Sequence, residues 1–146
     1  LKTGKSLGTE VPYAQLSDIR SGAADGDWQA VWRWADGAGL RLWMCGSQGT
    51  EVNLAMAPGQ RRRDEEGKRL PYLVVRRRGD GPLTSTFVAV HEPFRGVPGL
   101  RSVTLVGSDP GQPAWPVGLK VEAAGKVWTV TSTLAPGEAG LVVVSD

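Results

Sequence analysis

The sequence is poor in the residues that cross-link small domains or build metal sites. It has one cysteine, Cys45, and one histidine, His91, in 146 residues. A single cysteine excludes an intrachain disulfide framework and a paired-cysteine zinc motif. A single histidine excludes a multi-histidine metal centre. With no G-x-G-x-x-G and no Walker A sequence either, we expect neither a metal nor a cofactor.

Long apolar segments and paired acidic motifs are also missing. The longest uninterrupted apolar runs, such as Leu141 to Val144, are far shorter than the roughly 20 residues of a membrane-spanning helix, so no membrane partner is expected. The acidic residues are scattered over turns and suggest no facing pair of the kind that glycoside hydrolysis uses. We therefore nominate no catalytic residue. Because the chain starts with Leu1 rather than Met, we expect it to be a piece of a longer or processed protein.

Glycine and proline, by contrast, are abundant, and they predict an all-β chain. The 20 glycines and 10 prolines leave little room for a long helix, because each proline costs about 3 kcal/mol inside a helix and each glycine about 1 kcal/mol. Short strand candidates separated by turn signals predict an antiparallel β-sandwich, jelly-roll-like, with a small C-terminal β hairpin region. One helical turn is expected around Tyr13 to Asp18. The predicted strands are Trp28 to Trp34, Leu40 to Cys45, Thr50 to Ala57, Tyr72 to Arg78, Leu83 to Glu92, Leu100 to Val106, Val117 to Ala123, Lys126 to Leu134 and Leu141 to Ser145.

The spacing of these strands also predicts a division of the chain. Residues 1–106 form the β-sandwich portion, and residues 107–116, which are rich in proline and glycine, form a connection. Residues 117–146 form C-terminal strands of the same domain or a small subdomain.

Positive charge is concentrated in one segment. The chain carries a net charge of +2, whereas residues 61–78 hold eight basic and three acidic residues, a net charge of +5, which leaves −3 for the rest. Arg61, Arg62 and Arg63 open this segment on a charged loop. One interpretation is solvated loop and edge-strand charge that keeps sheet edges from pairing. The other is a contact for an anionic glycan, because guanidinium groups bind carboxylate or sulfate in a bidentate manner.

The remaining candidates for a functional role are the six tryptophans and the single histidine. Trp28, Trp32 and Trp34 alternate along one predicted strand and are expected to be buried, although exposed tryptophans elsewhere in a chain can stack on sugar rings. His91 ends a predicted strand beside Glu92. It is interpreted either as a glycan ligand or general base, or as a half-buried histidine that satisfies a hydrogen bond. Arginines and tryptophans lie on different segments, so nucleic acid is not an expected partner.

Several blocks resemble the late β-sandwich region of the heparinase II/III-like polysaccharide lyase family. They run from Asp25 to Val106 and cover a little over half of the chain. They are the residues Gly26 to Trp32, Leu40 to Leu42, Gly49 to Val52, Pro71 to Arg77 and Thr86 to Gly96.

The resemblance implies a part of a larger enzyme that cleaves uronic-acid-containing polysaccharide by β-elimination. Such an enzyme combines a helical toroid, a central sandwich and a small C-terminal β region, and its tyrosine and histidine act at the cleft between toroid and sandwich. His91 does not match the catalytic histidine of the family, so no catalytic residue is carried over. The implied partners are an alginate- or heparan-like anionic polysaccharide and the catalytic helical domain of the same enzyme, and the implied location is periplasmic or secreted.

We therefore expect a non-catalytic β-sandwich part of such a lyase, which supports the cleft or contacts anionic glycan, and which is inactive by itself. The glycan-contacting candidates are Arg61, Arg62, Arg63 and His91. The alternative is a free-standing carbohydrate-binding β-sandwich module. A complete small enzyme is the third possibility, and one histidine with unpaired carboxylates gives it the least support.

Overall fold

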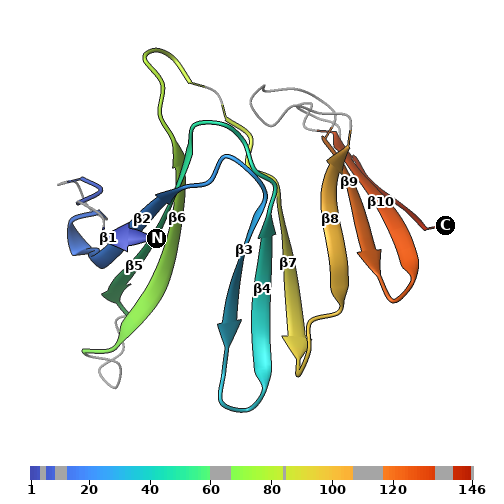
Figure 1. The fold of residues 1–146 in the computed structure, drawn as a ribbon, viewed down its shortest axis with the longest axis horizontal. Coiled ribbons are helices and arrows are strands. Elements are labelled where there is room, and N and C mark those ends of the chain that lie inside the picture. The colour runs from blue at the N-terminus through green and yellow to red at the C-terminus, as the bar shows by residue number, and fades with distance from the viewer. Residues whose placement is uncertain are drawn as a thin grey trace. The chain divides into compact units, whose positions relative to one another are not determined.

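The chain is built from antiparallel strands (Figure 1). The structure is a computed structural model that describes residues 1–3, 6–8, 13–59, 67–83, 85–106, 117–133 and 140–145. Within these ranges eleven strands form three antiparallel sheets, and one turn of 3-10 helix, η1 (Tyr13–Gln15), lies where a helical turn was predicted. The predicted all-β, sandwich-like class is confirmed. The chain divides into two compact units, residues 1–25 with 49–80 and residues 26–48 with 81–146.

The first unit contains one four-stranded sheet in the order β1-β2-β5-β6. Its strands are β1 (Lys2–Thr3), β2 (Ser17–Ala23), β5 (Thr50–Pro58) and β6 (Arg69–Arg77). Strand β5 lies in the middle and pairs with β6 over its full length, from Thr50 opposite Arg77 to Pro58 opposite Arg69. Ala55, in the middle of β5, is completely buried. Strands β1 and β2 were not predicted.

The second unit contains a three-stranded sheet in the order β3-β4-β7. Its strands are β3 (Trp28–Arg33), β4 (Ala38–Met44) and β7 (Ala89–Arg95). A tight turn joins β3 to β4, in which Trp34 donates a hydrogen bond to the carbonyl of Ala38 and Gly37 has a φ of 80°. Glycine suits this position because a left-handed backbone costs it little. The strands predicted from Trp28 to Trp34 and from Leu40 to Cys45 are therefore both present, and they form a hairpin.

Two predictions about this sheet are wrong. The strand predicted from Leu83 to Glu92 begins only at Ala89 and continues to Arg95. It runs through Pro93, which an edge strand tolerates because its outward N–H needs no partner. Trp34 was expected to be buried, but it is 56% exposed. The predicted alternation along β3 does hold, since Trp28 and Trp32 are partly buried and Val31 is exposed.

The second sheet of this unit has the order β11-β10-β9-β8, so each strand pairs with its neighbour in the sequence. Its strands are β8 (Leu100–Val106), β9 (Val117–Ala123), β10 (Lys126–Thr133) and β11 (Gly140–Ser145). Ala124 and Gly125 both have positive φ, 49° and 74°, as a two-residue turn between antiparallel strands requires. The predicted C-terminal hairpin and closing strand are present.

An apolar cluster joins the two sheets of the second unit. Its buried members are Cys45, Val103, Leu119 and Val121. Cys45 follows β4, and its backbone N–H donates to the carbonyl of Val88, 3.0 Å away. Burial, followed by the charge of Asp27, raises the pKa of the Cys45 thiol to about 11. The thiol therefore behaves as a small apolar core group rather than as a nucleophile.

A buried ion pair spans the junction between β7 and β8. Glu92 of β7 is 9% exposed. Its Oε1 accepts the backbone N–H groups of Gly99 (2.6 Å) and Leu100 (2.8 Å), and its Oε2 accepts Nε of Arg41 at 2.6 Å. The same guanidinium donates from Nη2 to the carbonyl of Leu100, 2.6 Å away, and lies over the ring of Trp43. Each charge is thus paired and hydrogen-bonded, which makes its burial tolerable.

We predict that Glu92→Gln destabilises the protein by about 3–5 kcal/mol, because it leaves the buried Arg41 guanidinium without its charge partner. Urea unfolding followed by tryptophan fluorescence measures this loss. The control is Asp36→Asn, which removes the carboxylate of an exposed pair with Arg95 whose side chains are 60% and 72% exposed. That control should cost less than about 1 kcal/mol, and equal losses for the two variants would contradict the prediction.

The same variant should flatten the dependence of stability on pH. Burial by itself raises the pKa of Glu92, but hydrogen bonds from Leu100, Arg41, Gly99 and Trp43 outweigh it and hold that pKa below its ordinary value. A carboxyl whose pKa is lowered on folding stabilises the protein above its unfolded pKa, and this stabilisation is lost as the pH falls through the folded pKa. Urea midpoints between pH 7 and pH 3 should therefore fall less steeply for Glu92→Gln than for the wild type.

Candidate functional site

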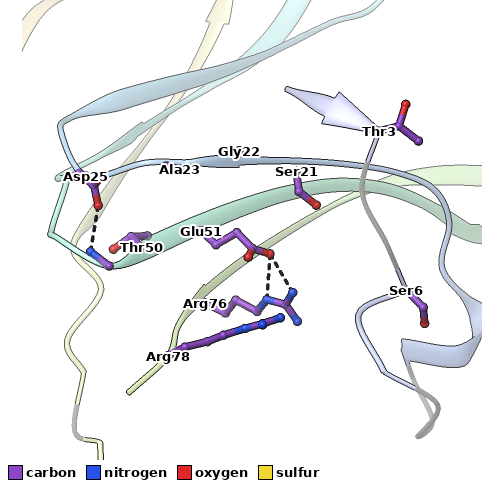
Figure 2. Close-up of a pocket in the computed structure, with 11 residues that line it drawn as sticks. Thr3, Ser6, Ser21, Gly22, Ala23, Asp25, Thr50, Glu51, Arg76 and Arg78 are labelled. Carbon is purple, nitrogen blue, oxygen red and sulfur yellow. Dashed lines mark hydrogen bonds and ion pairs between the residues drawn. The ribbon is translucent and has the colours of Figure 1, made fainter. Parts of the chain in front are cut away.

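An open hollow of about 750 Å³ lies in the first unit, beside the ends of β2, β5 and β6 (Figure 2). Most of its lining residues carry a charged or a hydroxyl group. They are Thr3, Ser6, Ser21, Asp25, Thr50, Glu51, Arg76 and Arg78. A hollow with this lining suits a hydrophilic ligand that both donates and accepts hydrogen bonds.

The pairing of β5 with β6 sets the central contact of the hollow. Glu51 lies directly opposite Arg76 in the ladder. Oε1 of Glu51 accepts Nε of Arg76 at 3.0 Å and Nη2 at 2.8 Å (Figure 2). Nη1 of Arg76 donates to the carbonyl of Leu7, 3.3 Å away. All three guanidinium nitrogens are therefore engaged, and the side chain is held in one orientation.

A buried amide lies behind this pair on the same strand face. Asn53 is two residues beyond Glu51 on β5 and has no exposed surface. Its Oδ1 accepts the hydroxyl of Ser21 at 2.6 Å, and its Nδ2 donates to the carbonyl of Val74 at 3.4 Å. Asn53 also helps to lower the pKa of the Glu51 carboxyl. Ser21, Asn53, Glu51 and Arg76 thus form one polar network across three strands.

This network keeps Glu51 ionised. Burial raises the pKa of Glu51, but hydrogen bonds from Arg76 and Asn53, together with the charges of Arg76 and Arg78, lower it below its ordinary value. The free oxygen of a carboxylate is a strong hydrogen-bond acceptor. At neutral pH the hollow therefore holds an acceptor fixed beside a guanidinium group.

Arg78 supplies the available positive charge. It is exposed, follows the end of β6 and lines the hollow next to Arg76 (Figure 2). Asp25, the other acidic residue of the lining, accepts the backbone N–H of Gly49 at 2.9 Å. Within the described part of the chain, no hydrogen bond or ion pair engages the Arg78 guanidinium. Its charge acts on Glu51, but its five donors have no hydrogen-bond partner among the described residues and can bind an anion.

The residues nominated from the sequence lie elsewhere. Arg61, Arg62 and Arg63 lie outside the described residues. His91 is exposed on β7 of the second unit, and the adjacent Glu92 is buried with its carboxylate occupied by Arg41 and backbone groups. Neighbours on a strand point to opposite faces. The structure therefore does not bring His91 and Glu92 together as an acid and base pair.

The network in the hollow was not predicted. Arg76 and Arg78 belong to the +5 segment, so charge had marked their region of the sequence. Ser21, Glu51 and Asn53 gave no signal, because isolated polar residues on strands are common and β2 itself was not recognised. Their assembly depends on register, which pairs Asn53 with Ser21 and Glu51 with Arg76.

Comparisons of the chain with family models, with curated proteins and with solved structures found no match in any of the three. Among the described residues, no group of three or more histidine, cysteine, aspartate or glutamate side chains is arranged to hold a metal ion. The same part of the chain contains no helix with the length and apolar character needed to cross a membrane.

We predict that Asn53→Asp destabilises the protein by about 3 kcal/mol or more at pH 7, because it buries a second carboxylate beside Glu51. Burial and the charge of Glu51 would raise the pKa of the new carboxyl above its unfolded value. The penalty is therefore present at neutral pH and diminishes as the pH falls and the group is protonated.

The control is Asn53→Ala, which removes the hydrogen bonds without adding charge. It should cost about 1–3 kcal/mol, with no comparable recovery at low pH. Urea unfolding of both variants at pH 7 and pH 4.5 gives the comparison. Equal losses at both pH values for both variants would show that position 53 is not sealed from water.

Proposed function

We propose that this chain is a non-catalytic β-sandwich part of a heparinase II/III-like polysaccharide lyase, and that it contacts the anionic glycan through the hollow of the first unit. The family assignment rests on the resemblance of the sequence blocks between Asp25 and Val106. The observation that carries the glycan contact is the exposed Arg78 guanidinium, which has no hydrogen-bond partner among the described residues, beside the fixed Glu51–Arg76 pair.

The chemistry of the hollow matches a uronic acid residue. A uronate ring carries one carboxylate and several hydroxyl groups. Arg78 can bind the carboxylate through two parallel N–H donors. The ionised Glu51 can accept from ring hydroxyls, and the hydroxyl group of Thr3 can either donate or accept. The combination of a cation for the carboxylate and an anion for the hydroxyls favours an acidic sugar over a simple inorganic anion.

The proposal assigns the β-elimination step to residues outside this chain. Removal of the proton next to a carboxylate needs a positioned base and a group that neutralises the developing negative charge. The described residues offer one histidine, His91, on the second unit, while the guanidinium groups of the hollow lie on the first unit. The role of the chain would be to hold glycan and to support the cleft formed with a helical domain.

We predict that Arg78→Ala weakens binding of a mannuronate hexasaccharide by about tenfold, since hydrogen bonds to a charged group contribute about 1.5–3 kcal/mol. Isothermal titration at 50 mM salt measures the affinity. The matched control is Arg101→Ala, which removes the same charge from an exposed position on β8 of the second unit. A charge reversal of Arg61, Arg62 and Arg63 in parallel tests the loop that the sequence nominated.

Two outcomes would contradict the proposal. One is wild-type protein that is not retained by alginate or heparan sulfate in an affinity gel. The other is an equal loss of affinity in the Arg78 and Arg101 variants, which would reduce the effect to net charge. In the same samples, a rise in ultraviolet absorbance from unsaturated uronate that persists through repurification would show that the chain itself is catalytic.

A further inference from the structure

A tryptophan is exposed at the turn end of the sheet β3-β4-β7. Trp34 has 56% of its surface open to solvent. The backbone N–H of Trp34 donates a hydrogen bond to the carbonyl of Ala38, so Trp34 continues the β3–β4 ladder by one pair. Exposure of so large an apolar ring is unfavourable in water. An exposed indole whose backbone is held at a sheet end is a feature that a ligand can use.

The register of the sheet places polar and apolar side chains around this indole. Ala38 lies between Trp34 and Arg95, since it pairs with both. In the next row Leu40 lies between Trp32 and Pro93. Residues directly opposite each other share a sheet face. The small side chain of Ala38 therefore lies between the larger side chains of Trp34 and Arg95 on one face of the sheet. Pro93 is exposed on the same face.

The polar rim of this surface is held in place. Nη1 of Arg95 donates to the carbonyl of Asp36 at 2.8 Å, and Nη2 donates to Oδ2 of Asp36 at 3.1 Å. The other carboxylate oxygen, Oδ1, accepts the N–H of Ala38 at 3.1 Å. Both charged groups remain largely exposed, at 72% and 60%. The rim thus presents fixed donors and a fixed acceptor with no net charge.

We propose that Trp34 and the Asp36–Arg95 pair form a stacking site for one pyranose ring of a polysaccharide, separate from the hollow of the first unit. The inference rests on the proposed function for the nature of the polymer. A pyranose ring has an apolar C–H face, which suits the indole face. Its edge carries hydroxyl groups that donate to Asp36 and accept from Arg95.

The size and charge of the surface favour a sugar over other partners. A stable protein interface buries about 800 Å² on each side, whereas here a few side chains surround one ion pair. Single-stranded nucleic acid binds aromatic rings interleaved with unpaired positive charge, whereas the arginine of this rim is neutralised by Asp36. His91 is exposed on the same face of β7, four residues before Arg95.

The test compares charged and neutral sugars. The probes are a mannuronate hexasaccharide and its carboxyl-reduced, neutral counterpart, and the variants are Trp34→Ala, Trp34→Phe and Arg78→Ala. Trp34→Ala should weaken binding of both sugars by the same factor of about fivefold, and Trp34→Phe by less, because an aromatic face remains. Arg78→Ala should weaken only the charged sugar. The neutral sugar should also change tryptophan emission in the wild type but not in Trp34→Phe.

Each outcome separates this site from the hollow. Neutral sugar that fails to bind the wild type, or binds Trp34→Ala as well as the wild type, overturns the stacking site while leaving the hollow intact. Loss of affinity in Trp34→Ala with none in Arg78→Ala overturns the hollow and keeps the stacking site. Tighter binding of a single-stranded oligonucleotide than of either sugar, lost in Trp34→Ala, overturns the assignment to a saccharide. Because Trp34 is exposed, the urea midpoints of its variants should match that of the wild type.

Discussion

The ion pair between Arg41 and Glu92 fixes how the second unit is put together. Strands β7 and β8 follow each other in the chain but belong to different sheets, so no backbone ladder joins them. The Glu92 carboxylate connects the two strands instead, because it accepts the backbone N–H groups of Gly99 and Leu100 at the start of β8. Arg41 completes the junction by binding both the carboxylate and the Leu100 carbonyl. The apolar cluster around Cys45 and Val103 packs between sheets whose junction is set by these charges.

A related arrangement organises the first unit. There Glu51 binds Arg76 on the neighbouring strand, and Asn53 helps to keep Glu51 ionised. In both units a carboxylate with a lowered pKa holds an arginine on a neighbouring strand. The two networks differ in access, because the Glu92 pair is closed off from solvent whereas the Glu51 pair opens onto the hollow. The Glu92 pair serves assembly of the second unit, and the Glu51 pair leaves charge available at a surface of the first unit.

Much of the strand layout could be predicted because turns and alternation are local signals. Strands β8 and β9 begin and end where the sequence indicated, since proline and glycine flank them. Strand β2 was missed because Ser17 to Ala23 shows no alternation, and its pairing with β5 includes a shift of register between Ser17 and Arg20. Trp34 was misjudged because periodicity identifies the face of a strand but not how far the covering layer extends. The candidate site depends on pairings between distant segments, and a single sequence does not reveal register.

The division into two units has a consequence for the order of folding. The β3–β4 hairpin is inserted between β2 and β5 in the sequence, so β2 can pair with β5 only after the intervening hairpin has been synthesised. Strand β4 can pair with β7 only later, because β5 and β6 come between them in the sequence. During synthesis each early strand therefore leaves the ribosome with one edge open, a state that favours wrong pairing. The tight turn at Gly37 lets β3 and β4 pair with each other first, because closing a short loop costs the least entropy.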